Sequence, residues 1–126
     1  MFDDATVADA MHTGLITCAA DATVAEVAQA MAQRRIHCVV VADGDGRRPW
    51  AVVGDLDLMA ALAAGGQVPA ASLAATEVVT VFPATPLAEA ARMMAEHQVS
   101  HLVVLDPVTA HPIGVVSTLD VARVAA

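Results

Sequence analysis

The sequence lacks lysine and tyrosine and has few aromatic residues, and each shortage excludes a class of partner. Trp50, Phe2 and Phe82 are the only aromatics among 126 residues, too few for a surface that binds single-stranded nucleic acid by base stacking. Six arginines stand against fourteen acidic residues, which gives a net charge of −8 at pH 7. Because affinity for phosphate backbones depends on basic side chains, we expect no binding to DNA, RNA or anionic membranes.

Features of membrane-spanning and secreted chains are also missing. The longest uncharged stretch, Leu58 to Thr76, is interrupted by glycine and proline and predicts a helix end followed by a linker. Asp3 and Asp4 stand where a secretory signal would be basic and then apolar, so no such signal is expected. Cys18 and Cys38 have no metal-ligand spacing, which predicts two reduced thiols and a cytoplasmic location.

The most informative feature that is present is an internal repeat. A shift by half the chain length lays the sequence on itself without a gap. The matches include polar, proline and methionine residues, which an alanine- and valine-rich chain does not pair by chance. Each half would bury little surface alone, so two copies with a shared core are expected, residues 1–64 and 65–126. The deciding pairs are Thr17 with Thr80, Glu26 with Glu89, Met31 with Met94, Pro49 with Pro112, and Asp57 with Asp120.

Each repeat predicts the element order β-α-β-β-α. Val24, Val27 and Met31 have the spacing of one buried helical face, and a linker around residues 65–69 joins the repeats. The sequence therefore predicts an α+β fold, with the two repeats packed sheet to sheet about a pseudo-twofold axis. The expected strands cover residues 15–18, 37–43 and 50–53 in the first repeat and 78–81, 101–106 and 113–116 in the second, with polar turns at 44–48 and 107–111.

The predicted helix starts carry capping signals. Thr23 and Glu26 have the spacing of a capping box at the start of the first long helix. In the second repeat, Thr85 is the expected N-cap and Pro86 the first helical residue.

The last helix of each repeat follows a short motif, AVVGDLD at residues 51–57 and GVVSTLD at residues 114–120. Ser117 and Asp120 have the spacing of a capping box, which satisfies free N–H groups at a helix start. The same N–H groups can bind an anion, and a carboxylate can accept two ribose hydroxyls. The spacing alone permits both a capping role and a ligand-binding role.

The repeated motifs VADAMHTGLITC, HQVSHLVVLD and GVVSTLDV, in this order, resemble a pair of cystathionine-β-synthase (CBS) domains, often called a Bateman module. The resemblance covers nearly the whole chain. It implies a regulatory module, often dimeric, that binds adenine nucleotides or related adenosyl ligands in clefts between the repeats. Asp120 would hold the ribose hydroxyls, Ser117 and His101 would face the phosphates, and four residues of the first repeat would line the adenine. The expected ligand-binding residues are Ser117, Thr118, Asp120, Gly114, Ile16, Thr17, Ile36, His37 and His101.

The corresponding site of the first repeat is expected to be weaker. Gly54 replaces Ser117 and removes a hydroxyl, and Asp55 replaces Thr118 and adds a carboxylate that would repel a phosphate. This site would be empty or restricted to a ligand such as adenosine. The alternative is that Asp55 is a capping acid that points to water. The residues expected there are Asp57, Val79, Thr80 and Val99.

No catalytic motif accompanies these sites. The histidines lack metal-binding spacing such as H-E-x-x-H, and Ser117 lies in no G-x-S-x-G turn. We therefore expect a non-enzymatic module that requires no cofactor or metal, and the resemblance implies AMP, ADP or ATP as its ligand. A homodimer is expected, and a regulated protein partner would be separate. The alternative is an interaction or dimerisation module without a small ligand.

Overall fold

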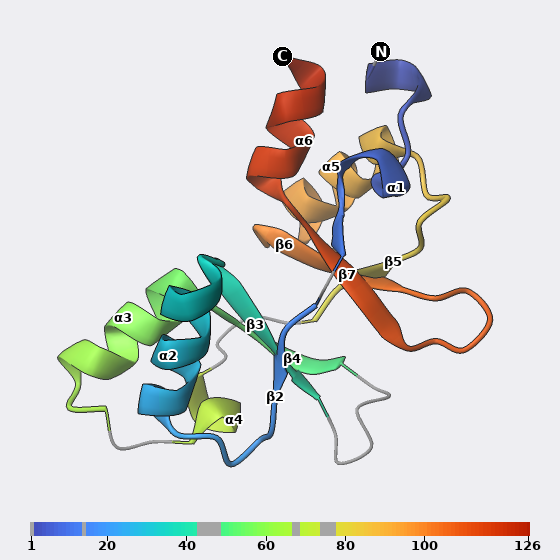
Figure 1. Ribbon diagram of the computed structural model, residues 1–126. Coiled ribbons are helices and arrows are strands. Elements are labelled where there is room, and N and C mark those ends of the chain that lie inside the picture. Colours follow the sequence, from blue (N-terminus) through green and yellow to red (C-terminus); the bar gives the residue numbers. More distant parts are fainter. Residues whose placement is uncertain (1, 14, 43–48, 67–68, 74–77) are drawn as a thin grey trace. The chain divides into compact units, whose positions relative to one another are not determined.

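The computed structural model describes residues 2–13, 15–42, 49–66, 69–73 and 78–126 (Figure 1). The chain divides into two compact units. The second-repeat unit comprises residues 1–15 and 78–126, and the first-repeat unit comprises residues 16–77. The predicted turn at 44–48 and residues 67–68 of the predicted linker lie outside the described residues. Within the described part of the chain, no helix is long and apolar enough to cross a membrane.

The second-repeat unit is built on a four-stranded sheet with the strand order β1-β7-β6-β5. β5 and β6 are parallel, whereas β7 runs antiparallel to both β6 and β1. Its elements are the 3-10 helix η1 (Phe2–Asp4), α1 (Val7–Ala10), β1 (His12–Thr13), β5 (Thr80–Val81), α5 (Leu87–His97), β6 (His101–Leu105), β7 (Pro112–Ser117) and α6 (Thr118–Ala125).

The first-repeat unit is built on a three-stranded sheet with the strand order β2-β3-β4. β2 is parallel to β3, and β3 is antiparallel to β4. Its elements are β2 (Thr17–Cys18), α2 (Val24–Arg34), β3 (Cys38–Ala42), β4 (Pro49–Gly54), α3 (Asp55–Ala63) and α4 (Ala70–Leu73).

The predicted α+β class and the β-α-β-β-α order of each repeat are confirmed. The order is β2-α2-β3-β4-α3 in the first repeat and β5-α5-β6-β7-α6 in the second, and matching elements begin in the register that pairs Thr17 with Thr80. The agreement extends to the helix ends. Arg35 and Gln98, the C-caps of α2 and α5, both adopt the left-handed conformation with φ of 54°.

One predicted helix start is confirmed and the other is wrong. Thr23 caps α2, since its hydroxyl accepts the Glu26 N–H at 3.1 Å. In the second repeat the N-cap is Pro86 instead of Thr85, and α5 begins at Leu87. The Thr85 hydroxyl accepts the Phe82 N–H at 3.2 Å and stabilises the preceding turn. Pro86 adopts an extended ψ of 138° and is the repeat equivalent of Thr23, so the repeat register gives the correct boundary.

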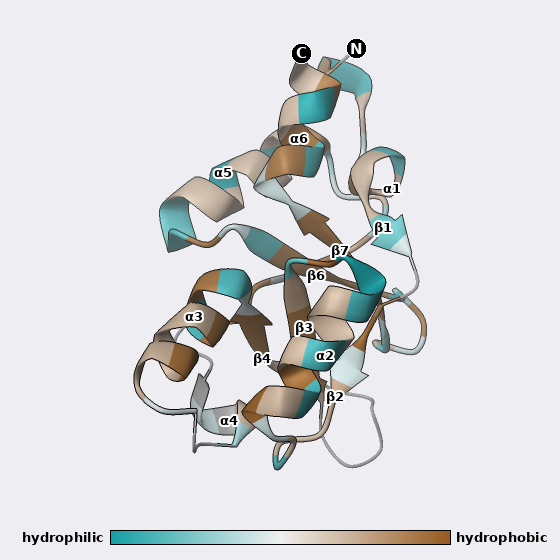
Figure 2. Ribbon diagram, turned by 60° about the vertical axis from the view of Figure 1, so that its left-hand side comes forward, coloured by the Kyte–Doolittle hydropathy of each residue, from teal (hydrophilic) through white to brown (hydrophobic). Residues whose placement is uncertain are grey.

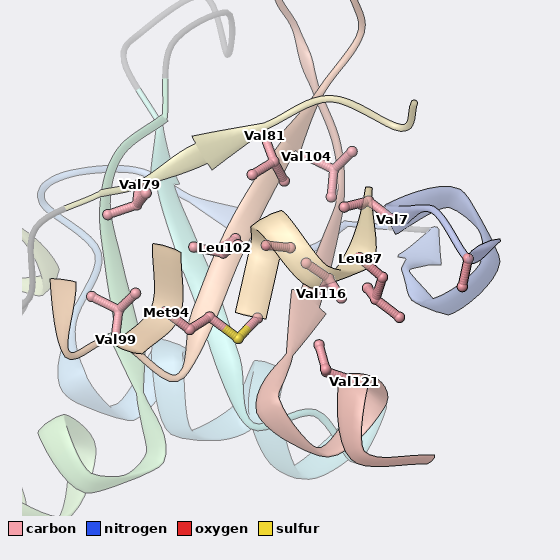
Figure 3. Close-up of a cluster of buried hydrophobic side chains, with 12 residues drawn as sticks. Val7, Val79, Val81, Leu87, Met94, Val99, Leu102, Val104, Val116 and Val121 are labelled. Atoms are coloured by element: carbon pink, nitrogen blue, oxygen red, sulfur yellow. The ribbon is translucent and has the colours of Figure 1, made fainter. Parts of the chain in front are cut away.

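Each hydrophobic core is completed by a short helix from the other repeat. Val7 of α1 is fully buried in the core of the second-repeat unit, beside Leu87 (Figure 3). Its backbone N–H donates to the Thr85 carbonyl at 2.9 Å. Ala70 of α4 is fully buried in the core of the first-repeat unit, and its N–H donates to the Ala22 carbonyl at 2.8 Å. The two leading helices α1 and α4, which the pattern analysis missed, therefore occupy equivalent places in opposite units.

Candidate functional site

The start of α6 carries the predicted capping box. The Ser117 N–H donates to Oδ2 of Asp120 at 2.8 Å, and the Asp120 N–H donates to the Ser117 hydroxyl at 3.2 Å. The capping interpretation is thereby confirmed. It leaves the binding interpretation open, because a serine hydroxyl that accepts one hydrogen bond retains its own hydrogen for a further acceptor.

Asp120 is the one buried charged side chain among the described residues, with 4% of its surface exposed. Its second oxygen, Oδ1, lies 2.6 Å from Nε2 of His12 and 4.0 Å from Nη1 of Arg123. A carboxylate withdrawn from water needs such donors. The sequence analysis did not single out His12, which lies 108 residues away along the chain.

His101 and Thr118 lie near this helix start. His101 is the cross-strand partner of Ser117 in the pairing of β6 with β7. Its Nδ1 is 2.9 Å from the Ser100 hydroxyl. Thr118 is exposed, and its backbone N–H donates to the Ser100 carbonyl at 2.9 Å. The structure therefore brings together Ser117, Thr118, Asp120 and His101, a set with hydroxyl and imidazole groups and a single carboxylate.

Gly114 lies three residues before Ser117 on β7 and has a structural explanation of its own. It is buried and pairs with Thr13 of β1 and Val104 of β6. A Cβ at this position would collide with the carbonyl oxygen of His12 and the terminal methyl of Met11. The glycine thus allows β1 to approach β7, and its predicted contact with a ligand stays a prediction.

The corresponding helix start in the first repeat differs in charge. Oδ2 of Asp57 accepts the Gly54 N–H at 2.8 Å, as Asp120 does for Ser117. Asp55, however, places Oδ1 2.8 Å from the backbone nitrogen of Leu56 and Oδ2 3.3 Å from Nδ1 of His37. The carboxylate of Asp55 is therefore turned back onto its own helix start, where it accepts one of the N–H groups that the helix itself leaves without a partner.

The other predicted residues are distributed over the two units. Ile16 and Ile36 are half-buried and Thr17 is exposed in the first-repeat unit. The equivalent residues of the second-repeat unit are Val79 and Val99, which are buried, and Thr80, which is half-buried. Their contacts with a ligand stay predictions.

Two units of one β-α-β-β-α design, each with an aspartate that caps its last helix, define a tandem-repeat module. The model of the CBS domain matches residues 7–64 and again residues 70–126, so the chain belongs to the CBS domain family. The resemblance drawn from the sequence motifs is confirmed. No curated protein sequence matches the chain significantly.

Solved structures of CBS domain pairs share the fold over nearly the whole chain. The CBS domain protein PAE2072 from Pyrobaculum aerophilum, complexed with AMP, is 29% identical with a TM-score of 0.81, over 91% of this chain and 88% of that one. The CBS domain pair of protein MJ0100, in complex with 5′-methylthioadenosine and S-adenosyl-L-methionine, is 21% identical with a TM-score of 0.84, over 95% and 94%. CBSX2 in complex with AMP is 23% identical with a TM-score of 0.77, over 96% of each chain.

Proposed function

We propose that the two repeats, residues 1–64 and 65–126, act together as a non-catalytic regulatory module that binds an adenine nucleotide. The observation that carries this proposal is the buried carboxylate of Asp120 at the start of α6, beside the hydroxyl of Ser117. A carboxylate can accept ribose hydroxyls, and a helix start with hydroxyl groups can bind a phosphate. The AMP complex of the 29% identical relative supports the same ligand class.

The second-repeat unit supplies the phosphate-binding end of this site. Ser117 offers an O–H hydrogen, Thr118 offers an exposed side chain, and His101 lies across the sheet from Ser117. The partial positive charge of a helix start favours an anion. AMP, ADP and ATP are the candidate ligands, and Ile16, Thr17, Ile36 and His37 are the proposed adenine-side residues.

The first-repeat unit supplies a site that disfavours phosphate. The Asp55 carboxylate accepts the Leu56 N–H and lies 3.3 Å from Nδ1 of His37, so it adds a negative charge to this helix start and engages one of its N–H groups. We infer that the site around Asp57 takes a nucleoside without a phosphate or stays empty, with Val79, Thr80 and Val99 as its other proposed residues. One nucleotide per chain is the expected stoichiometry.

The test is binding of AMP, ADP, ATP and adenosine, measured by calorimetry and by thermal unfolding. A nucleotide at one hundred times its dissociation constant stabilises the folded chain by about 2.7 kcal/mol. Asp120→Ala should abolish nucleotide binding. Asp57→Ala is the matched control, because both carboxylates cap their own helix at 2.8 Å and both variants lose that cap. If no compound shifts the unfolding temperature, or if the two variants bind nucleotide equally well, the proposal is wrong.

An exposed apolar stripe supports a homodimer as part of the proposal. Leu56, Met59 and Leu62 on α3 are 79%, 52% and 49% exposed, and α3 shows hydrophobic bands along its length (Figure 2). Solvent-exposed apolar stripes of this kind are typical of association surfaces. Sedimentation should give a dimer that Leu56→Glu dissociates; a monomeric wild-type chain would contradict this part. The two cysteines, Cys18 and Cys38, lack metal-ligand spacing, which supports the proposed cytoplasmic location.

A further inference from the structure

The contact between His12 and Asp120 joins an exposed side chain to a buried one. The His12 side chain is 67% exposed and the Asp120 side chain 4%, and Nε2 lies 2.6 Å from Oδ1. A carboxylate has no hydrogen to donate when it is ionised, so the imidazole N–H is the donor. His12 therefore covers one oxygen of the carboxylate from the solvent side.

The position of His12 is built into the fold. β1 pairs antiparallel with β7, with His12 opposite Val115 and Thr13 opposite Gly114. The Met11 N–H donates to the Val7 carbonyl at 2.8 Å and fixes the chain between α1 and β1. The absence of a side chain at Gly114 is what lets the backbone of His12 come this close. The imidazole is thus held beside Asp120 by backbone contacts on both sides of the residue.

Both oxygens of Asp120 are engaged before any ligand arrives. Oδ2 accepts the Ser117 N–H at 2.8 Å, and Oδ1 faces His12. A ribose diol bound by one carboxylate needs access to its outer lone pairs. Only 4% of Asp120 is exposed, so a ribose hydroxyl reaches its carboxylate only if the imidazole moves. The His12 side chain is 67% exposed, so the imidazole has solvent on its outer side into which it can move.

We propose that His12 is an affinity-determining residue of the nucleotide site, an internal donor that a ribose hydroxyl must displace from Oδ1 of Asp120. This inference rests on the proposed function of Asp120. The free energy of the His12–Asp120 hydrogen bond is subtracted from that of nucleotide binding. The repeat equivalent of His12 is Ala75, whose side chain has no hydrogen-bond donor.

The experiment compares AMP binding to the full chain by calorimetry in wild type and His12→Ala. We expect the variant to bind AMP about three- to tenfold more tightly than wild type, the range of a hydrogen bond to a charged group reduced for solvent exposure. His111→Ala, which removes another exposed histidine, is the matched control and should leave AMP affinity unchanged.

Equal or weaker AMP binding by His12→Ala with an unchanged circular dichroism spectrum would overturn the inference. A second measurement does not depend on how the variant folds. In wild type, saturating AMP should move the NMR signals of the His12 ring to those of a solvent-exposed imidazole, and unchanged ring signals would also overturn it. If wild type binds AMP and these tests fail, only the role of His12 is lost; if neither protein binds AMP, the proposed function fails as well.

Discussion

A single charge at the start of α6 should decide whether the second-repeat site accepts a phosphate. Thr118→Asp reproduces at this helix the arrangement of Asp55, whose carboxylate lies 2.8 Å from the nitrogen of the next residue. The new carboxylate would occupy the Leu119 N–H, which is worth about 1.5–3 kcal/mol as a hydrogen bond to a charged group. It would also repel a phosphate about 4 Å away by about 1 kcal/mol in water and up to about 4 kcal/mol near a protein surface.

The smallest total of these terms, about 2.5 kcal/mol, predicts that AMP affinity falls by at least about 50-fold. Calorimetry measures the loss, with Thr118→Asn as the uncharged control and adenosine as the ligand without a phosphate. Folding should not suffer, since an acid in the first turn of a helix is stabilising. Unchanged AMP affinity, or an equal loss for adenosine, would refute the electrostatic reasoning. The reciprocal Asp55→Thr should let the chain bind a second AMP.

Three further predictions concern stability and reactivity. Gly114→Ala should destabilise the chain by about 1–3 kcal/mol in urea unfolding, because the added methyl meets the main chain of β1; an unchanged midpoint would contradict the packing. Burial, and after it the Glu26 carboxylate, raises the pKa of the Cys18 thiol, so alkylation of Cys18 at pH 8 should be slower in the native than in the unfolded chain, and equal rates would contradict the shift. Hydrogen bonds from the turn, foremost from the Thr109 N–H, lower the pKa of Asp106. Its stabilisation is therefore present above the ordinary aspartate pKa of about 3.9 and is lost as the pH falls through the lowered folded pKa, so the unfolding midpoints of wild type and Asp106→Asn should converge in acid.

The alignment of the two repeats predicted most of the secondary structure. Once Thr17 is matched with Thr80 and Asp57 with Asp120, the boundaries of one repeat fix those of the other, and the elements of the structure follow the same register. The error at Thr85 arose where a local capping preference was chosen over that register. The capping preference of Thr85 does not set the helix boundary, because Pro86 itself adopts the extended conformation that precedes α5.

The contacts that the sequence did not predict are those between distant segments. Thr6 and Asp9 form a capping spacing that marks α1, but nothing in residues 7–10 indicates that Val7 would be buried beside Leu87. The pairing of His12 with Asp120 depends on β1 joining β7 across most of the chain. Hydrophobic periodicity and capping signals concern segments of a few residues, so neither predicts which strands are neighbours in a sheet.

The placement of α1 and α4 in opposite units bears on how such a chain could originate. A single repeat of this design would have an incomplete core unless a second molecule contributed its leading helix, as in a domain-swapped dimer. End-to-end fusion of two gene copies turns that exchange into an intramolecular one, no longer sensitive to dilution. The present polypeptide has the connectivity expected of a domain-swapped dimer joined into a single chain, in which the second-repeat unit contains Ser117 and His12 and the first-repeat unit contains Asp55.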